Sequence, residues 1–261
     1  MKRWLAVAAV AFAVALPAGA EAICRIPPPP TQRVTVEEGV SSATLTKGRG
    51  SWNSSSLLLE ARDGNKRSAY IRAADDVRFG ENDNEYEGGA YLALTPHAIA
   101  DLIGSFSPQH HVLPASSVQG DMDFRAGAGY GYQVGYAARR YSAVDAAIGH
   151  LGMDRYFRDL RLAGTLTFAR LSNIPGVALS EGISLARYLP CDTENIAFST
   201  GRDVENVGVG TPPAVYHSLA IFLGATHRLT PHVGLNFGVG WYGLTGAYDR
   251  FEVRVALRER L

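Results

Sequence analysis

The last third of the chain alternates apolar and polar residues along three successive segments. Apolar side chains stand at every second position over 218–224, 233–241 and 251–257, with Phe222 as the one exception. A period of two predicts β-strands with one apolar face. About 10 residues is also the length that a tilted strand needs to cross a lipid bilayer.

Segments of this kind recur along the chain from Gln32 onward. Tight turns such as 63–65 alternate with longer connections, of which 201–213 is expected to be the longest. Short connections at one end and longer ones at the other are typical of outer-membrane barrels. We therefore predict an all-β fold, a closed antiparallel transmembrane β-barrel of about 14 strands, or 12 if neighbours merge. The fourteen expected segments are 32–44, 51–62, 66–79, 85–95, 97–107, 114–126, 129–141, 143–156, 159–170, 177–189, 194–201, 214–229, 231–242 and 248–260.

Residues 1–22 have the pattern of a secretion signal. Lys2 and Arg3 precede an apolar run over 4–16, and Ala20 and Ala22, with one residue between them, fit a cleavage site. An uncleaved anchor helix is the alternative, although the apolar run is short for a membrane span.

Residues 23–31 are expected to form a proline-rich periplasmic tether, and residues 32–261 the barrel. Cys24 raises the alternative of a lipoprotein, but Ile23 occupies the place where a small residue is required. No later segment reaches 18 apolar residues, which excludes a helical membrane protein. We therefore expect Sec-type export to the outer membrane of a Gram-negative bacterium.

The chain contains 25 basic and 25 acidic residues, so its formal net charge is zero and no nucleic-acid partner is indicated. Cys24 and Cys191 are its only cysteines. Both are expected on the periplasmic side, where the oxidising environment would permit a disulfide between them. The sequence by itself does not give the distance between the two thiols.

Charged residues on the polar faces of the strands are expected to point into the lumen, because a basic side chain facing lipid costs about 2–4 kcal/mol at mid-depth. These residues could form a selectivity lining or a structural network of ion pairs that fills the barrel. The expected lumen residues are Arg72, Arg78, Glu87, Asp121, Asp123, Arg125, Asp145, Arg161, Glu252, Arg254 and Arg258.

The extracellular loop expected after residue 200 begins with the charged residues Arg202, Asp203 and Glu205. This loop could act as a gate or surface contact, or it could simply be hydrogen-bonded onto the rim of the barrel.

Aromatic residues near the strand ends suit the girdles that mark membrane interfaces, although β-propensity alone would also explain them. The residues concerned are Trp52, Tyr86, Tyr130, Tyr141, Tyr156, Phe157, Tyr188, Tyr216, Trp241, Tyr242, Tyr248 and Phe251.

Motifs for catalysis or cofactor binding are not recognisable. The seven histidines show no metal-ligand spacing of the His-x-x-x-His kind, and no Gly-x-Ser-x-Gly sequence is present. The acidic segment 81–85 lacks the glycine and the spacing of a calcium loop. We therefore expect no metal, no cofactor, no catalytic residues and no enzymatic activity.

Three stretches together resemble the YaiO-like family of outer-membrane β-barrels: residues 145–157, 180–188 and 199–205. Arg140-Tyr141 before Ser142, and Leu113-Pro114 at the start of a strand, add to the resemblance. The resemblance implies an outer-membrane barrel, often near envelope or exopolysaccharide functions, and supplies no catalytic residues. One departure is the C-terminal residue, Leu261, where such barrels commonly end in an aromatic residue.

These features predict a narrow channel or an accessory in envelope or exopolysaccharide export. A non-conducting structural or interaction barrel is the main alternative, and a barrel enzyme acting on lipid or polysaccharide is the second. The expected partners are outer-membrane lipid, the barrel-assembly machinery and polysaccharide-export components. The strand register can be tested at two adjacent residues, because Ile221 should face lipid whereas Ala220 should face the lumen.

Overall fold

The structure, a computed structural model, describes residues 32–64 and 66–261. The expected signal peptide, the proline-rich tether and Cys24 lie outside the described residues. Among the residues described, no helix is long and apolar enough to cross a membrane.

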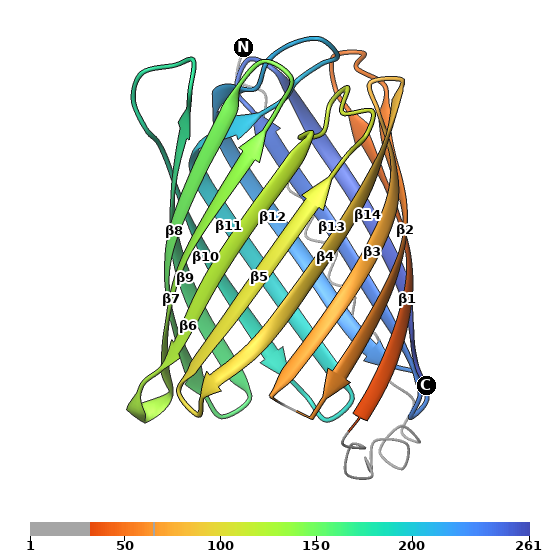
Figure 1. The fold of residues 1–261 in the computed structure, drawn as a ribbon, viewed down its shortest axis with the longest axis vertical. Helices are drawn as coiled ribbons and strands as arrows, with labels where there is room; N and C mark the ends of the chain where they lie inside the picture. The colour runs from red at the N-terminus through yellow and green to blue at the C-terminus, as the bar shows by residue number, and fades with distance from the viewer. Residues whose placement is uncertain (1–31, 65) are drawn as a thin grey trace, which may run out of the picture.

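The described chain forms a barrel of fourteen antiparallel strands, closed by pairing of the first strand with the last (Figure 1). This confirms the predicted number, and the twelve-strand alternative is wrong. The strands are β1 (Gln32–Leu45), β2 (Ser51–Asp63), β3 (Arg67–Arg78), β4 (Glu81–Thr95), β5 (Ala98–Phe106), β6 (Ser116–Arg125), β7 (Tyr130–Arg140), β8 (Asp145–Phe157), β9 (Leu160–Leu171), β10 (Ala178–Tyr188), β11 (Asp192–Glu205), β12 (Ala214–Arg228), β13 (Val233–Leu244) and β14 (Tyr248–Arg260). A 3₁₀ turn, η2 (Gly127–Gly129), connects β6 to β7.

The outer wall of the barrel is apolar. Along β12 the side chains of Leu219, Ile221 and Leu223 are exposed, whereas Ala220 and Phe222 between them are partly covered and face the interior. The same alternation leaves Ile71 65% exposed and Val118 64% exposed on the outside. Because exposure of large apolar side chains to water is unfavourable, this exterior is suited to a lipid environment.

The two ends of the barrel differ in their connections (Figure 1). At the end that holds the first residue of β1 and the last residue of β14, called the turn end here, all connections are tight turns; the opposite end is called the loop end. Both copies of Leu-Thr-Pro-His, at 94–97 and 229–232, fall at the turn end.

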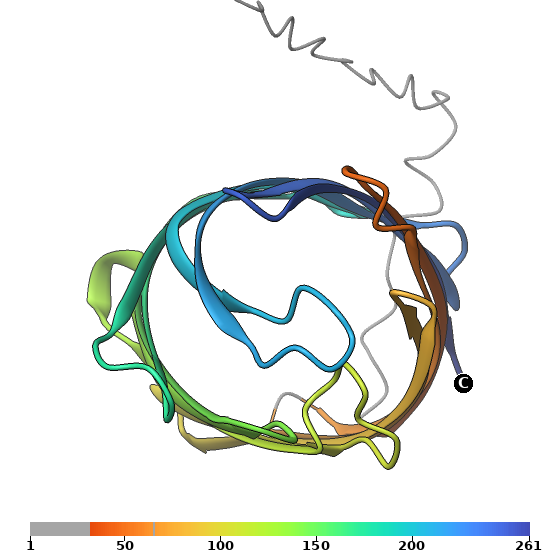
Figure 2. The same cartoon turned by 90° about the horizontal axis from the view of Figure 1, so that it is seen from above.

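The longest described connection at the loop end is 107–115, between β5 and β6. The expectation that 201–213 would be the longest is wrong, because β11 and β12 stay paired as far as Glu205 and Ala214. Seen from above, the tip of this β11–β12 pair folds across the interior of the ring (Figure 2).

Candidate functional site: a charged lumen beneath an infolded hairpin

Five arginines lie together on the inner wall at the turn end, on four of five consecutive strands. We call Arg33, Arg62, Arg228, Arg258 and Arg260 the arginine sector. Arg33 lies opposite Arg62 in the register of β1 with β2, and Gly234 of β13 lies opposite both Arg228 and Arg258. The strand order β12-β13-β14-β1-β2 explains this proximity, because residues far apart in sequence meet on adjacent strands.

Two carboxylates balance part of this charge. Glu60 lies 2.6 Å from a guanidinium nitrogen of Arg258 and 2.8 Å from one of Arg62. Glu37 lies 3.9 Å from Arg258 and accepts a hydrogen bond from Asn236 at 3.0 Å. Glu37 and Glu60 were not among the expected lumen residues.

An acidic sector lies across the barrel, on β5, β6 and β8. Its members are Asp101, Asp121, Asp123 and Asp154. His150 lies 2.6 Å from Asp121, and Arg161 lies 2.5 Å from Asp154. In the closed order of strands β8 lies opposite β1, so acidic and basic sectors face one another across the lumen.

A third network occupies β3 and β4. Arg72 lies 3.2 Å from Glu85 and 4.0 Å from Glu87, and the hydroxyl of Tyr70 donates a hydrogen bond to Glu87 at 2.9 Å. Arg78 pairs with Asp76 at 3.4 Å nearer the loop end. The contacts of Arg72 and Tyr70 join β3 to β4, whereas the Arg78–Asp76 pair lies within β3.

Arg254 and Phe222 form a further inward pair. The guanidinium of Arg254 lies 4.8 Å from the centre of the Phe222 ring and 3.3 Å from Glu252. The ring rests against Gly238, where an added Cβ atom would lie 2.8 Å from the ring. The glycine therefore leaves the space that lets this aromatic ring lie inside the barrel.

Of the expected lumen residues, Asp145 alone faces the other way. It begins β8 on the outward side and lies 3.7 Å from Arg140 at the loop end. Inward positions of β8 are the even-numbered ones, including Ala146 and His150. His150 and Asp154 lie on this inward face and were not among the expected lumen residues.

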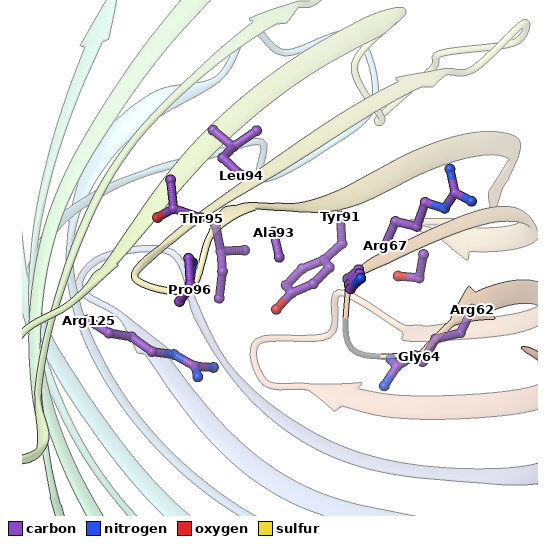
Figure 3. Close-up of a pocket in the computed structure, with 12 residues that line it drawn as sticks. Arg62, Gly64, Arg67, Tyr91, Ala93, Leu94, Thr95, Pro96 and Arg125 are labelled. Atoms are coloured by element: carbon purple, nitrogen blue, oxygen red, sulfur yellow. The ribbon is translucent and has the colours of Figure 1, made fainter. Parts of the chain in front are cut away.

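Arg125 ends β6 at the turn end and lines a cavity of about 760 Å³ (Figure 3). In Figure 3 its side chain extends into this cavity, as does that of Tyr91. Arg62 of the arginine sector also lines the cavity, together with Lys66 and Arg67. No acidic side chain is among the residues that line it.

At the loop end, residues 202–217 leave the wall and form what we call the infolded hairpin. Pairing of β11 with β10 ends at Gly201, and pairing of β12 with β13 ends at Ser218. Beyond these points β11 and β12 pair only with one another. The blue segment inside the ring in Figure 2 is this hairpin.

Gly201 is the point at which β11 departs from the wall. Its φ angle of +140° belongs to a backbone conformation that L side chains rarely adopt. An added Cβ atom would also lie 2.5 Å from the carbonyl oxygen of Leu179. Glycine is therefore required here for the hairpin to turn inward.

The infolded hairpin is held on two sides by apolar contacts. Val204 and Val215 pack against the buried side chains of Val144, Ala146 and Leu171 on one side of the mouth. Val207 packs on the other side against a second buried cluster, whose members are Ala43, Trp52, Leu244, Ala247 and Tyr248. The hairpin therefore spans the mouth of the barrel.

The structure of the mouth differs from two expectations. Trp52 and Tyr248 are buried inside the barrel, at 6% and 1% exposure, and do not belong to an outer aromatic girdle. Arg202, Asp203 and Glu205 were expected in a loop, but all three lie in strand β11, where Asp203 and Glu205 are partly buried and Arg202 is exposed. Backbone pairing with β12 continues as far as Glu205, and Asp203 also accepts hydrogen bonds from Ser218 and Tyr242.

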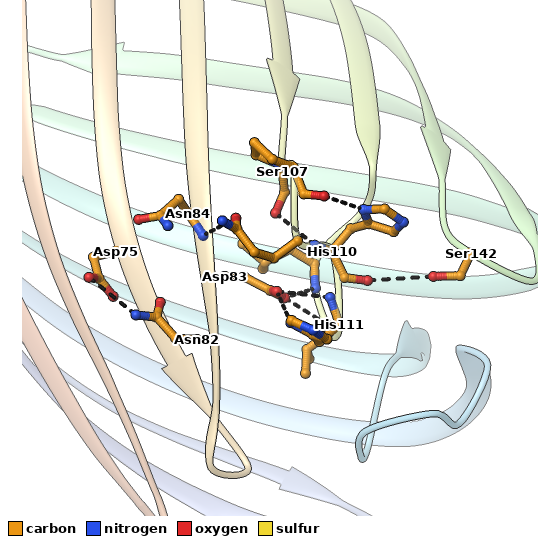
Figure 4. A network of polar contacts seen from close by, with 12 residues as sticks. Asp75, Asn82, Asp83, Asn84, Ser107, His110, His111 and Ser142 are labelled. Atoms are coloured by element: carbon orange, nitrogen blue, oxygen red, sulfur yellow. Dashed lines mark hydrogen bonds and ion pairs between the residues drawn. The ribbon is translucent and has the colours of Figure 1, made fainter.

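The connection 107–115 is fixed to the barrel by Asp83 (Figure 4). This carboxylate, 2% exposed, accepts backbone hydrogen bonds from His111, Val112 and Leu113 at 2.7–2.9 Å. It also accepts one from the ring of His111 at 2.9 Å. Asn206 then joins the infolded hairpin to this connection by donating to the carbonyl oxygen of Val112.

Two remaining expectations concern metals and the disulfide. In residues 32–64 and 66–261 no group of three or more His, Cys, Asp or Glu side chains could hold a metal ion. Cys191 lies in the turn between β10 and β11, at the turn end. Since Cys24 lies outside the described residues, the Cys24–Cys191 disulfide stays a prediction.

A closed barrel with an apolar exterior and a charged lumen defines an outer-membrane β-barrel of the porin-like type. The chain belongs to the YaiO membrane beta barrel family, whose sequence profile matches residues 33–202. The protein is therefore located in the Gram-negative outer membrane. In such barrels the short turns face the periplasm, so the turn end is periplasmic and the loop end extracellular.

Solved structures share the fold at low sequence identity. A bacterial polysaccharide outer membrane secretin is 8% identical with a TM-score of 0.56, over 87% of this chain and 98% of that one. The CymD monoaromatic hydrocarbon channel is 7% identical with a TM-score of 0.55, over 88% of each chain. Omp33 of Acinetobacter baumannii is 12% identical with a TM-score of 0.54, over 87% and 98%. No curated protein gives a significant sequence match.

Proposed function

We propose that the protein is a narrow passage through the outer membrane, constricted at its extracellular mouth by the infolded hairpin. The observation that carries the proposal is the placement of residues 202–217, which leave the wall and cross the mouth above a charged lumen. A role in envelope or polysaccharide export is part of the proposal, in keeping with the barrel of the polysaccharide secretin that shares this fold.

The polar interior supports a passage for hydrophilic solutes. A cavity of about 470 Å³ lies between β1–β3 and β11–β14, lined by Arg72, Asn195 and Arg254 among others. A charged, hydrated lumen lowers the barrier to polar solutes, whereas the apolar exterior faces lipid.

A non-conducting barrel is the second candidate, and the apolar packing of the hairpin favours it. Val207 lies against the Trp52–Tyr248 cluster, so opening the mouth would expose apolar surface to water. In this case the hairpin would be a permanent plug and the loop end a surface for contact with other molecules.

Single-channel recording in planar bilayers separates the two candidates. We expect discrete current steps from the full-length protein, and larger steps when residues 206–213 are replaced by Asn-Gly, a turn-forming pair that would shorten the hairpin. The matched control replaces 173–176, in the connection between β9 and β10 at the same end, by Asn-Gly, and it should leave the step size unchanged. Absence of current from both the full-length protein and the shortened hairpin would support the non-conducting barrel.

A further inference from the structure

The arginine sector at the turn end holds more positive charge than its carboxylates balance. Five guanidinium groups face two carboxylates, Glu37 and Glu60, and both of these carboxylates are already engaged by Arg258. In the described part of the chain, no carboxylate oxygen lies within 4.0 Å of Arg33, Arg228 or Arg260.

Hydrogen-bond donors in this sector also lack partners. The Nε atoms of Arg33 and Arg258 are buried and make no hydrogen bond within the described protein. Buried donors without partners are unfavourable, and guanidinium groups are the donors best matched to carboxylate and phosphate oxygens. The sector is therefore built to receive anionic oxygen atoms.

The adjoining cavity provides room for such a ligand (Figure 3). Its volume of about 760 Å³ falls in the ordinary range for small-molecule sites. Arg62 belongs to both the arginine sector and the cavity, and Arg125 reaches into the cavity from β6 without a carboxylate within 4.0 Å in the described chain.

We infer that the periplasmic vestibule, formed by the arginine sector and this cavity, binds solutes that carry carboxylate or phosphate groups. The inference rests on the proposed function, because it names the class of solute that the passage takes from the periplasm. The acidic sector on the opposite wall repels the same groups and directs them onto the arginines. Binding at the vestibule does not itself require an open mouth at the other end.

Equilibrium binding to the detergent-purified full-length protein tests the site independently of conduction. Calorimetric titration at low ionic strength would use three probes: trigalacturonate, which carries carboxylates, inorganic phosphate, and neutral maltotriose. We expect trigalacturonate or phosphate to bind and maltotriose not to bind, and added salt to weaken the binding. The probe that binds identifies whether the site prefers carboxylates or phosphates.

The variant pair Arg228→Gln and Arg260→Gln, made together, removes two arginines that have no carboxylate partner. We expect roughly tenfold weaker binding or more, since hydrogen bonds to charged groups contribute on the order of that factor each. The matched control is Arg155→Gln with Arg187→Gln, which removes the same charge from the outward side of the turn end. Heat-modifiable gel mobility would establish that both double variants are folded.

Three results would overturn the inference: no binding of either anion, equal binding of maltotriose, or equal weakening in the control pair. A protein that binds anions but passes no current would retain the site and refute the passage. A protein that passes current but binds neither anion would retain the passage and refute the site.

Discussion

Asn206 donates a hydrogen bond from its side-chain amide to the carbonyl oxygen of Val112 at 3.2 Å, between residues that lie 94 positions apart in the chain. This bond connects the infolded hairpin with the connection 107–115, which Asp83 holds in turn. The two longest described connections at the loop end therefore cover the mouth as one linked unit.

Substitution Asn206→Asp should weaken this link selectively. The aspartate retains an acceptor for the backbone N–H of Gly208, which Asn206 now binds at 3.1 Å, but has no donor for Val112. We expect a loss of about 1 kcal/mol or more at the mouth, because the carbonyl loses its partner. The measurement is amide hydrogen exchange, which should become faster over 206–213 and stay unchanged in the strands at the turn end. Unchanged exchange over 206–213 as well would contradict the link.

Substitution Gly201→Ala should destabilise the barrel near the hairpin. The strained φ angle alone contributes about 1–3 kcal/mol, and contact with the Leu179 carbonyl adds to it. Unfolding by guanidinium in detergent measures the loss. Gly104→Ala is the matched control, because the nearest atom to its added Cβ is 3.9 Å away. Equal stability of the two variants would mean that Gly201 is not needed for the inward turn.

Substitution Asp83→Ala should release the connection 107–115. Three backbone N–H groups would lose their acceptor, and each such loss costs about 1–3 kcal/mol when the group stays buried. Hydrogen exchange at His111, Val112 and Leu113 should rise strongly. Asn82→Ala, one residue away on the outward side, should leave these amides protected; protection in both variants would show that other contacts hold the connection.

Arginine substitutions at Ile221 and Ala220 should differ in effect. Ile221→Arg places a charge on the outer face and should lose about 2–4 kcal/mol if the residue lies near mid-depth, whereas Ala220→Arg projects into the polar lumen. The measurements are the folded fraction by heat-modifiable mobility and the free energy of unfolding. The reverse order of damage would show that β12 is shifted by one residue.

Peptide mapping under non-reducing conditions should yield a cross-linked pair containing Cys24 and Cys191. The periplasm is oxidising, and Cys191 lies in a turn at the periplasmic end. Cys191→Ser serves as the control and should release the Cys24 peptide. Recovery of the two peptides separately from the unsubstituted, fully oxidised protein would rule out the disulfide.

The sequence by itself determined the barrel and most of its facing, and it favoured fourteen strands while leaving twelve open. Alternation along β12 and the turn residues between strands are local properties, and period-two patterning needs no knowledge of neighbours. The assignment of Arg72 and Arg258 to the interior followed from the same rule. The same rule placed Asp145 wrongly because a strand end offers too few alternating residues to define its register.

Only the tertiary structure decided which side chains meet. The arginine sector joins β12, β14, β1 and β2, and the contact between Arg258 and Glu60 spans 198 positions in the chain. Closure of the barrel brings these strands together, and no local sequence pattern encodes a contact between residues so far apart in the chain. The inward turn at Gly201 likewise depends on where β10 and β13 stop pairing, so the sequence suggested a surface loop where the fold has an infolded hairpin.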